Sequence, residues 1–205
     1  MKLFISFAIM AFVLSTGLGL FLLKDSREQH PALITLPDNG DFTLYKGDVE
    51  VHLSDFKDKL VLIYFGYTAC PDICPTSLAF MSAALKKLTE DELSKVQVLF
   101  VSVDPERDTA EKLRDYTAYF HPKILGLTGA KADIDKVVEQ YGASYKKVAS
   151  NSAMGYIIDH TASSYMVTSQ GQLIGFIEHD TPIDKIIEAI QNGIRTVKNY
   201  QWTQW

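Results

Sequence analysis

Residues 66–75 contain both cysteines of the 205-residue chain, Cys70 and Cys74, with three residues between them. A disulfide between them would close a very small ring, which constrains the unfolded chain far less than a long-range bridge does. The pair is therefore better suited to chemistry than to holding a domain together. Thiolate is the nucleophilic and metal-binding form of cysteine, so the two sulfurs could form a redox disulfide or bind one soft metal ion together.

The residues around the cysteines favour an ionised sulfur. Residues 60–65 are continuously apolar, which is typical of a strand buried on both faces, and Pro75 is a good first residue for a helix. The unpaired N–H groups and positive dipole end of that helix would favour thiolate at Cys74. A C-x₃-C pair alone is a moderate signal, because structural pairs also occur, but its place between a strand and a helix strengthens it.

A metal site of two thiolates needs at least one more ligand, and the chain has five histidines. His30 lies in a polar segment, and His52 alternates with apolar residues in a predicted strand, which favours a solvent-facing side chain. His121 ends a predicted helix, where a cationic imidazole suits the helix dipole. His179 precedes the last predicted helix and is expected to be exposed. These four histidines are better explained by roles other than metal binding.

Hydrophobic periodicity and turn residues predict the elements that must position these side chains. Predicted strands are residues 42–44, 49–53, 60–65, 96–103, 124–127, 144–148, 156–158, 164–168 and 173–177. Predicted helices run from 75 to about 88, from a capping-box pattern at 108–111 to about 120, from 132 to 141, and from 181–182 to about 197. Alternating β and α units, then a hairpin and a closing helix, predict an α/β fold. The predicted architecture is a thioredoxin-like mixed sheet flanked by helices, with an N-terminal hairpin.

His160 and its neighbour Asp159 lie in a predicted loop between two late strands. An isolated histidine in such a place more often has a structural role. The predicted fold changes this interpretation, because in a thioredoxin-like domain the loop before the late hairpin approaches the cysteine loop. His160 is therefore the candidate third ligand, and Asp159 is a candidate for orienting its imidazole.

Residues 3–23 carry no charge and are long enough to form one transmembrane helix. A cleaved signal peptide is the competing interpretation, but its apolar region is usually shorter and ends at a small-residue site. We expect a transmembrane anchor at residues 1–24, a tether at 25–41 and one domain at 42–205. The flanking charges are nearly balanced, so the short N-terminal flank decides the orientation and places the domain outside the cytoplasm.

The composition excludes several other classes of protein. A charged fraction of 22% with 47% hydrophobic residues is typical of a globular chain. The first 24 residues hold two lysines and no acids, so the remainder carries a formal charge of −7, against −5 for the whole chain. An acidic domain without a basic stripe repels nucleic acid, so no nucleic-acid partner is expected.

Three segments, in this order, resemble the Sco/SenC family of copper proteins: YFGYTACPDICPTSL, VSVDPERDT and IIDHTASSYMVTSQGQLIGF. The similarity extends from about Val49 to Ala189, and the combination of the three motifs is specific. The resemblance implies a thioredoxin-like fold and a role in building the dinuclear copper centre of cytochrome c oxidase. It also implies that copper is bound by Cys70, Cys74 and His160.

The resemblance implies partners and a location as well. The expected partners are the copper-bearing subunit of cytochrome c oxidase, other periplasmic copper carriers or thiol reductants, and the membrane. The expected location is the bacterial inner membrane, with the domain in the periplasm. The acidic family motif falls on residues 104–109, for which we expect a structural or partner-facing role. Ala69 occupies a place that is often histidine, but this departure removes no ligand.

The chemistry of the three residues agrees with the resemblance. Two thiolates and one imidazole form a soft set of low coordination number that suits Cu(I), and Cu(II) heads the affinity order for divalent ions. Structural zinc would need four ligands, and the sequence has no second Cys/His pair. A disulfide between Cys70 and Cys74 would remove both thiolates, so metal loading would depend on redox state.

Three hypotheses follow from the sequence. The first is a membrane-anchored copper metallochaperone, which is a carrier rather than an enzyme. The second is a thiol–disulfide oxidoreductase that reduces the cysteines of the oxidase copper site, although the x₃ spacing differs from the C-x-x-C of thioredoxin-type motifs. The third is an anchored interaction module whose cysteines form a structural disulfide.

Overall fold

Strand β4 (Leu60–Gly66) lies at the centre of the sheet, and all seven of its residues are buried. A strand without a polar face must be covered on both sides, which explains its continuously apolar sequence. The computed structural model describes residues 34–151 and 154–202, and all of them belong to one unit, Leu33–Trp205. The predicted transmembrane segment, residues 3–23, lies outside the described residues.

The main sheet has six strands in the order β1-β10-β9-β4-β5-β6. Strands β4, β5 (Val96–Ser102) and β6 (Ile124–Leu127) are parallel. On the other side of β4, strand β9 (Ser164–Thr168), β10 (Gln172–Ile177) and the short β1 (Ile34–Thr35) pair in antiparallel fashion. This mixed sheet confirms the predicted α/β class.

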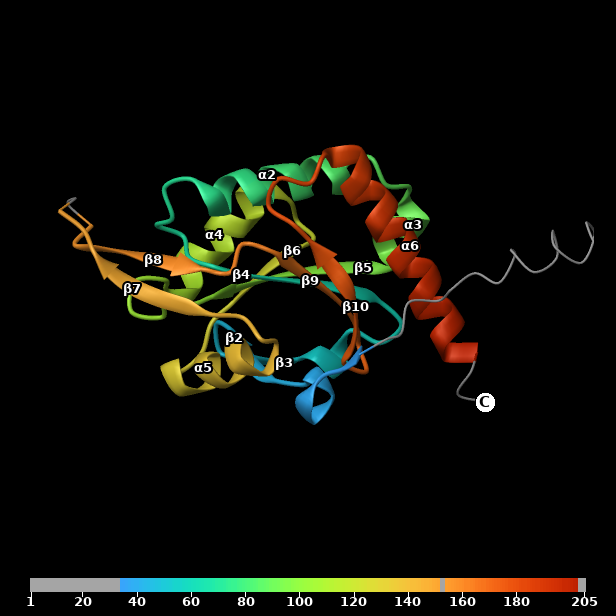
Figure 1. The fold of residues 1–205 in the computed structure, drawn as a ribbon, viewed down its shortest axis with the longest axis horizontal. Coiled ribbons are helices and arrows are strands. Elements are labelled where there is room, and N and C mark those ends of the chain that lie inside the picture. Colours follow the sequence, from blue (N-terminus) through green and yellow to red (C-terminus); the bar gives the residue numbers. More distant parts are fainter. Residues whose placement is uncertain (1–33, 152–153, 203–205) are drawn as a thin grey trace, which may run out of the picture. The chain divides into compact units, whose positions relative to one another are not determined.

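Helices cover both faces of the sheet (Figure 1). On one face lie α2 (Ile73–Leu85), α4 (Ala110–Phe120), α6 (Ile183–Trp202) and the short α3 (Glu90–Ser94). On the other lie α5 (Lys131–Gln140) and the hairpin of β2 (Thr43–Lys46) and β3 (Val49–His52). Two 3₁₀ turns, η1 (Pro37–Gly40) and η2 (Leu53–Asp55), flank that hairpin in the sequence.

A second hairpin, β7 (Tyr145–Ala149) and β8 (Tyr156–His160), forms its own two-stranded sheet. Figure 1 shows it extending beyond the main sheet as an arm. The register pairs Tyr145 with His160 and Ala149 with Tyr156, so His160 lies at the base of the arm and Tyr156 toward its tip. The position of His160 therefore depends on what holds this hairpin against the domain.

Most predicted elements are confirmed within a few residues, and the differences are local. Helix α2 begins at Ile73 instead of Pro75, so Cys74 is a helical residue. The side chain of Thr109, rather than Asp108, caps α4 by accepting a hydrogen bond from the Lys112 amide at 3.2 Å. Helix α3 is not among the elements predicted from the sequence, and α6 continues past residue 197.

Residues 34–41, assigned to the tether from the sequence, are folded onto the domain. Strand β1 pairs with β10 and forms the edge of the main sheet, and Leu36 is buried. The Gln140 side-chain amide donates to the backbone carbonyls of Pro37 and Asp41 at 2.6 and 3.1 Å. The folded region thus begins before Phe42. Within the part of the chain that the structure describes, no helix has the length and apolar character needed to cross a membrane.

Candidate metal centre

The fold brings Cys70, Cys74 and His160 together, as the sequence predicts. The two sulfurs and a ring nitrogen of His160 all lie within 4.8 Å of one another. The Sγ of Cys74 is 3.2 Å from Nε2 of His160, although 86 positions separate the two residues in the chain. Two sulfurs and one imidazole nitrogen at these distances can share a single soft metal ion.

The two cysteines differ in their surroundings. Cys70 is half-buried in the loop between β4 and α2, whereas Cys74 is fully buried in the first turn of α2. The backbone amide of Cys74 lies 3.4 Å from the Sγ of Cys70, so an N–H group of the first helical turn points at that sulfur. Positive partial charge at a helix N-terminus stabilises thiolate. The dipole therefore acts on Cys70, and the expectation from the sequence that it would favour thiolate at Cys74 is wrong.

The pKa values of the two thiols shift in opposite directions. A hydrogen bond from the Cys74 thiol, followed by contacts with His160 and backbone amides, outweighs burial and lowers the pKa of Cys70 to about 3. The same sulfur–sulfur hydrogen bond, together with burial, raises the pKa of Cys74. In the metal-free, reduced protein the pair thus holds one thiolate, on the more exposed sulfur.

Gly66 makes room for the buried sulfur at the end of β4. A Cβ atom at this position would lie 2.9 Å from the Sγ of Cys74 and 2.9 Å from a ring carbon of Phe100. Both distances are too short for a side-chain carbon. The close approach of strand to helix that brings Cys74 toward His160 therefore requires glycine here.

His160 is the last residue of β8, not part of a loop as predicted. Its Nδ1 lies 3.0 Å from the carbonyl oxygen of Thr161. Because a carbonyl only accepts hydrogen bonds, Nδ1 carries the proton and Nε2 directs its lone pair toward the cysteines. Tyr64 and Tyr67 contact the ring edge-on, at centroid distances of 6.0 and 5.9 Å.

Asp159 does not occupy the place that the sequence analysis gave it. It is exposed, and its backbone lies opposite that of Lys146 in the β7–β8 ladder. Successive side chains of a strand point to opposite faces, which separates Asp159 from the ring of His160. The structure thus places the Thr161 carbonyl, rather than the Asp159 carboxylate, at Nδ1.

The remaining described histidines have other partners. Nδ1 of His52 lies 3.1 Å from the Phe42 carbonyl. His121 is buried and its Nδ1 accepts from the Lys123 amide at 3.1 Å. Burial, and then the charges of nearby lysines, lower the pKa of His121, so the cationic form predicted from the helix dipole is disfavoured. Nδ1 of His179 lies 2.7 Å from Ser77 Oγ, and the side chain is half-buried rather than exposed. His30 lies outside the described residues.

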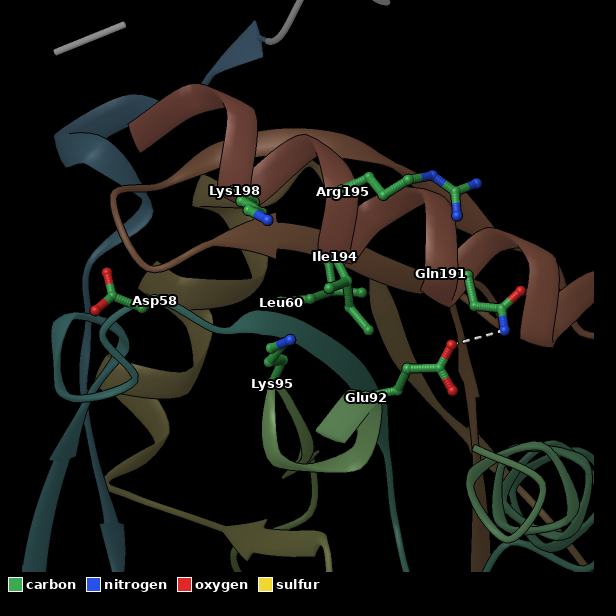
Figure 2. A pocket seen from close by; sticks show the side chains of 8 residues that line it. All are labelled: Asp58, Leu60, Glu92, Lys95, Gln191, Ile194, Arg195 and Lys198. Carbon is green, nitrogen blue, oxygen red and sulfur yellow. Dashed lines mark hydrogen bonds between the residues drawn. The ribbon is translucent and has the colours of Figure 1, made fainter. Parts of the chain in front are cut away.

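A cavity of about 500 Å³, whose lining side chains Figure 2 shows, is not lined by any of the three candidate ligands. It is lined by Leu60, the first residue of β4, whereas the cysteine loop follows the last residue of that strand. Its wall combines Lys95 and Lys198 with Glu92, which accepts a hydrogen bond from Gln191 at 2.8 Å. The candidate metal centre is thus separate from this cavity.

The comparison with known sequences identifies the family. A family model described as SCO1/SenC matches residues 35–195. The SCO2-like protein of Rickettsia conorii is 36% identical over 155 residues, which cover 75% of this chain and 75% of that protein. Protein SCO1 homolog 1 of Arabidopsis thaliana is 34% identical over 157 residues, 76% of this chain and 47% of that protein. The chain thus spans about half of the plant relative. It belongs to the SCO1/SenC family.

Solved structures agree with this assignment. Apo Sco1 from Thermus thermophilus is 36% identical, with a TM-score of 0.71, over 79% of this chain and 92% of that one. ScoI of Arabidopsis thaliana with copper bound is 31% identical, with a TM-score of 0.71, over 79% and 99%. BsSco, at 25% identity and a TM-score of 0.61 over 80% and 96%, is described as a cytochrome c oxidase assembly protein with a disulfide switch. These similarities confirm the α/β thioredoxin-like fold.

Proposed function

We propose that the chain is a copper metallochaperone that binds one copper ion through Cys70, Cys74 and His160. The convergence of these three side chains carries the proposal, because their ligand atoms all lie within 4.8 Å. The copper-bound structure of the plant relative supports the choice of metal. Soft sulfur ligands favour Cu(I), and a half-buried Cys70 leaves the site accessible for transfer.

The proposed recipient is the copper-bearing subunit of cytochrome c oxidase. Support comes from the family, since BsSco is described as an oxidase assembly protein. Other periplasmic copper carriers or thiol reductants would load or reduce the site. The N-terminal segment would anchor the protein in the bacterial inner membrane, with the domain in the periplasm. In that oxidising compartment, Cys70 and Cys74 would form a reversible disulfide that blocks loading.

A competition titration with a Cu(I) chelator tests the ligand set. The reduced full-length chain is compared with the variants Cys70→Ser, Cys74→Ser and His160→Ala. Each variant should bind Cu(I) more than about 100-fold more weakly, since removing a ligand costs more than removing an outer-shell partner. His179→Ala is the matched control, because it removes an imidazole that contacts Ser77 instead. Unchanged affinity in all three ligand variants would refute the proposal.

A thiol–disulfide oxidoreductase is the second candidate, favoured by the lowered pKa of Cys70. The Cys70 thiolate would attack a disulfide of the oxidase subunit and form a mixed disulfide. Cys74 would then displace the partner, which leaves with two thiols while the chain keeps a Cys70–Cys74 disulfide. The His160→Ala variant distinguishes the two candidates. If it keeps both full reductase activity and wild-type copper affinity, the oxidoreductase is favoured.

A further inference from the structure

The loop between β5 and α4, residues 103–109, contacts both segments that carry the candidate ligands. Asp108, which is buried, accepts hydrogen bonds from the amide and the hydroxyl of Thr68 at 2.9 and 2.5 Å. Thr68 belongs to the cysteine loop. Arg107 donates through Nη1 to the carbonyl of Tyr156, at 3.1 Å, and to that of Met154, at 3.3 Å. Those carbonyls belong to the β7–β8 hairpin and its turn.

Arg107 is held in place by a buried acid. The carboxylate of Asp104 is fully buried and pairs with the Nε of Arg107, whose side chain is 20% exposed. The hydroxyl of Tyr156 donates to the same carboxylate at 2.7 Å. A buried carboxylate needs such partners, so the pair has little freedom to move. Tyr156 therefore attaches strand β8 to the loop in two ways: its hydroxyl binds Asp104, and its backbone carbonyl binds Arg107.

The Arg107 guanidinium also lies between two aromatic rings. Its central carbon is 3.6 Å from the ring centroid of Tyr156 and 5.6 Å from that of Tyr67. Tyr67 contacts the His160 ring edge-on, and its hydroxyl accepts a hydrogen bond from the Ile158 amide at 3.1 Å. Arg107 thus contacts β8 directly at Tyr156. It also contacts Tyr67, whose hydroxyl binds β8 at Ile158, two residues before His160.

We propose that Arg107 is a positioning residue for His160, because it fixes the β7–β8 hairpin against the cysteine loop. The hairpin is not part of the main sheet, so ladder hydrogen bonds from that sheet do not set the place of its base. Arg107 instead determines how close Nε2 of His160 comes to the cysteine sulfurs. This inference rests on the proposed function, in that the ligand being positioned is one for copper.

The test combines Arg107→Lys with His160→Ala in a double-mutant cycle, using Cu(I) affinity of the reduced full-length protein. Lysine can still pair with Asp104 but loses the planar fork that reaches two carbonyls. Arg107→Lys should weaken Cu(I) binding at least about tenfold, as outer-shell changes do. In the His160→Ala background the same change should alter affinity by less than about twofold, because the ligand being positioned is gone. Arg114→Lys, on the exposed face of α4, is the matched control.

A second measurement needs no metal. The amides of Ile158 and Thr161 flank His160 and donate to Tyr67 and to the Ser144 carbonyl, at 3.1 and 2.9 Å. In the metal-free protein, Arg107→Lys should speed their hydrogen exchange at least about tenfold, while amides of β4 keep their protection. Tyr156→Phe, which loses only the hydroxyl bond to Asp104, should have a smaller effect in the same direction.

The outcomes separate the two proposals. Wild-type Cu(I) affinity in Arg107→Lys, or an equal loss in both backgrounds, would overturn the positioning role and leave the proposed function intact. A wild-type protein that binds no copper would overturn the proposed function. Exchange at Ile158 and Thr161 would then decide whether Arg107 holds His160, and unchanged exchange would overturn that role too.

Discussion

Gly66 shows how one residue without a side chain shapes the candidate site. The strand ends where the Cys74 sulfur needs the space that a Cβ would take, at 2.9 Å. Cores respond to such overpacking by shifting side chains or backbone. At the residue scale, the geometry of the site thus depends on an absent methyl group as well as on the three candidate ligands.

Gly66→Ala should destabilise the protein by about 1–3 kcal/mol and weaken Cu(I) binding, because the new methyl group displaces the Cys74 sulfur. Urea unfolding and chelator competition measure the two effects. Gly175→Ala is the matched control, since a Cβ there would meet nothing within 4 Å. Equal effects of the two substitutions would contradict the close approach of Gly66 and Cys74.

The reactivity of Cys70 should depend little on pH. Its pKa is lowered to about 3, so the thiolate is fully present above roughly pH 5 and is lost only as the pH falls toward that pKa. Alkylation of the reduced, metal-free protein by iodoacetamide should therefore proceed at a nearly constant rate between about pH 5 and 8. Cys70→Ser should react far more slowly, because Cys74 is buried and its pKa is raised. A tenfold fall in rate per pH unit below pH 8 would show an ordinary thiol instead.

At the element scale, helix α2 and the β7–β8 hairpin position candidate ligands, whereas helix α4 does not. Helix α2 places Cys74 in its first turn, and β8 places His160 at its last residue. Helix α4 has no such task, although it follows the loop that contacts both ligand-bearing segments. Its N-cap should therefore matter for stability and not for metal binding.

Thr109→Ala tests this separation. Loss of the hydrogen bond from the Lys112 amide to the Thr109 hydroxyl should cost about 1 kcal/mol, or roughly 2–4 °C in melting temperature. Cu(I) affinity should stay within about twofold of the wild type. A tenfold change, which corresponds to about 1.4 kcal/mol, is not expected. Thr109→Ser keeps the hydroxyl and should restore stability. A loss of copper affinity that matches the loss of Arg107→Lys would show that the whole loop, and not its arginine, governs the site.

At the scale of the whole molecule, local patterns predict much of the fold. The apolar run 60–65, the β2–β3 hairpin and most helix ends follow from periodicity and turn residues, and the structure confirms them. The contact between His160 and Cys74, however, joins residues 86 positions apart. The hydrogen bonds of Arg107 to the carbonyls of Met154 and Tyr156 span 47 and 49 positions. Such pairings depend on tertiary packing, which a single sequence does not specify.

The contacts of residues 104–109 are also long-range. The motif is visible in the sequence, but nothing local shows that Arg107 reaches Tyr156 or that Asp108 reaches Thr68. Adjacency in the sequence makes Asp159 a candidate partner of His160, but strand geometry sends neighbouring side chains to opposite faces. Correct prediction of β8 through residue 160 would have excluded that choice.

The central claim is that one copper ion binds to Cys70, Cys74 and His160. Anaerobic metal titration of the reduced full-length protein, with absorption spectra for both copper oxidation states, tests it most directly. One equivalent of copper should bind, and the Cu(II) form should show thiolate-to-copper charge-transfer bands that are lost in Cys70→Ser and Cys74→Ser. Prior oxidation to the Cys70–Cys74 disulfide should abolish binding, because both thiolates are removed. Copper bound at the same stoichiometry by the disulfide form, without charge-transfer bands, would contradict the account.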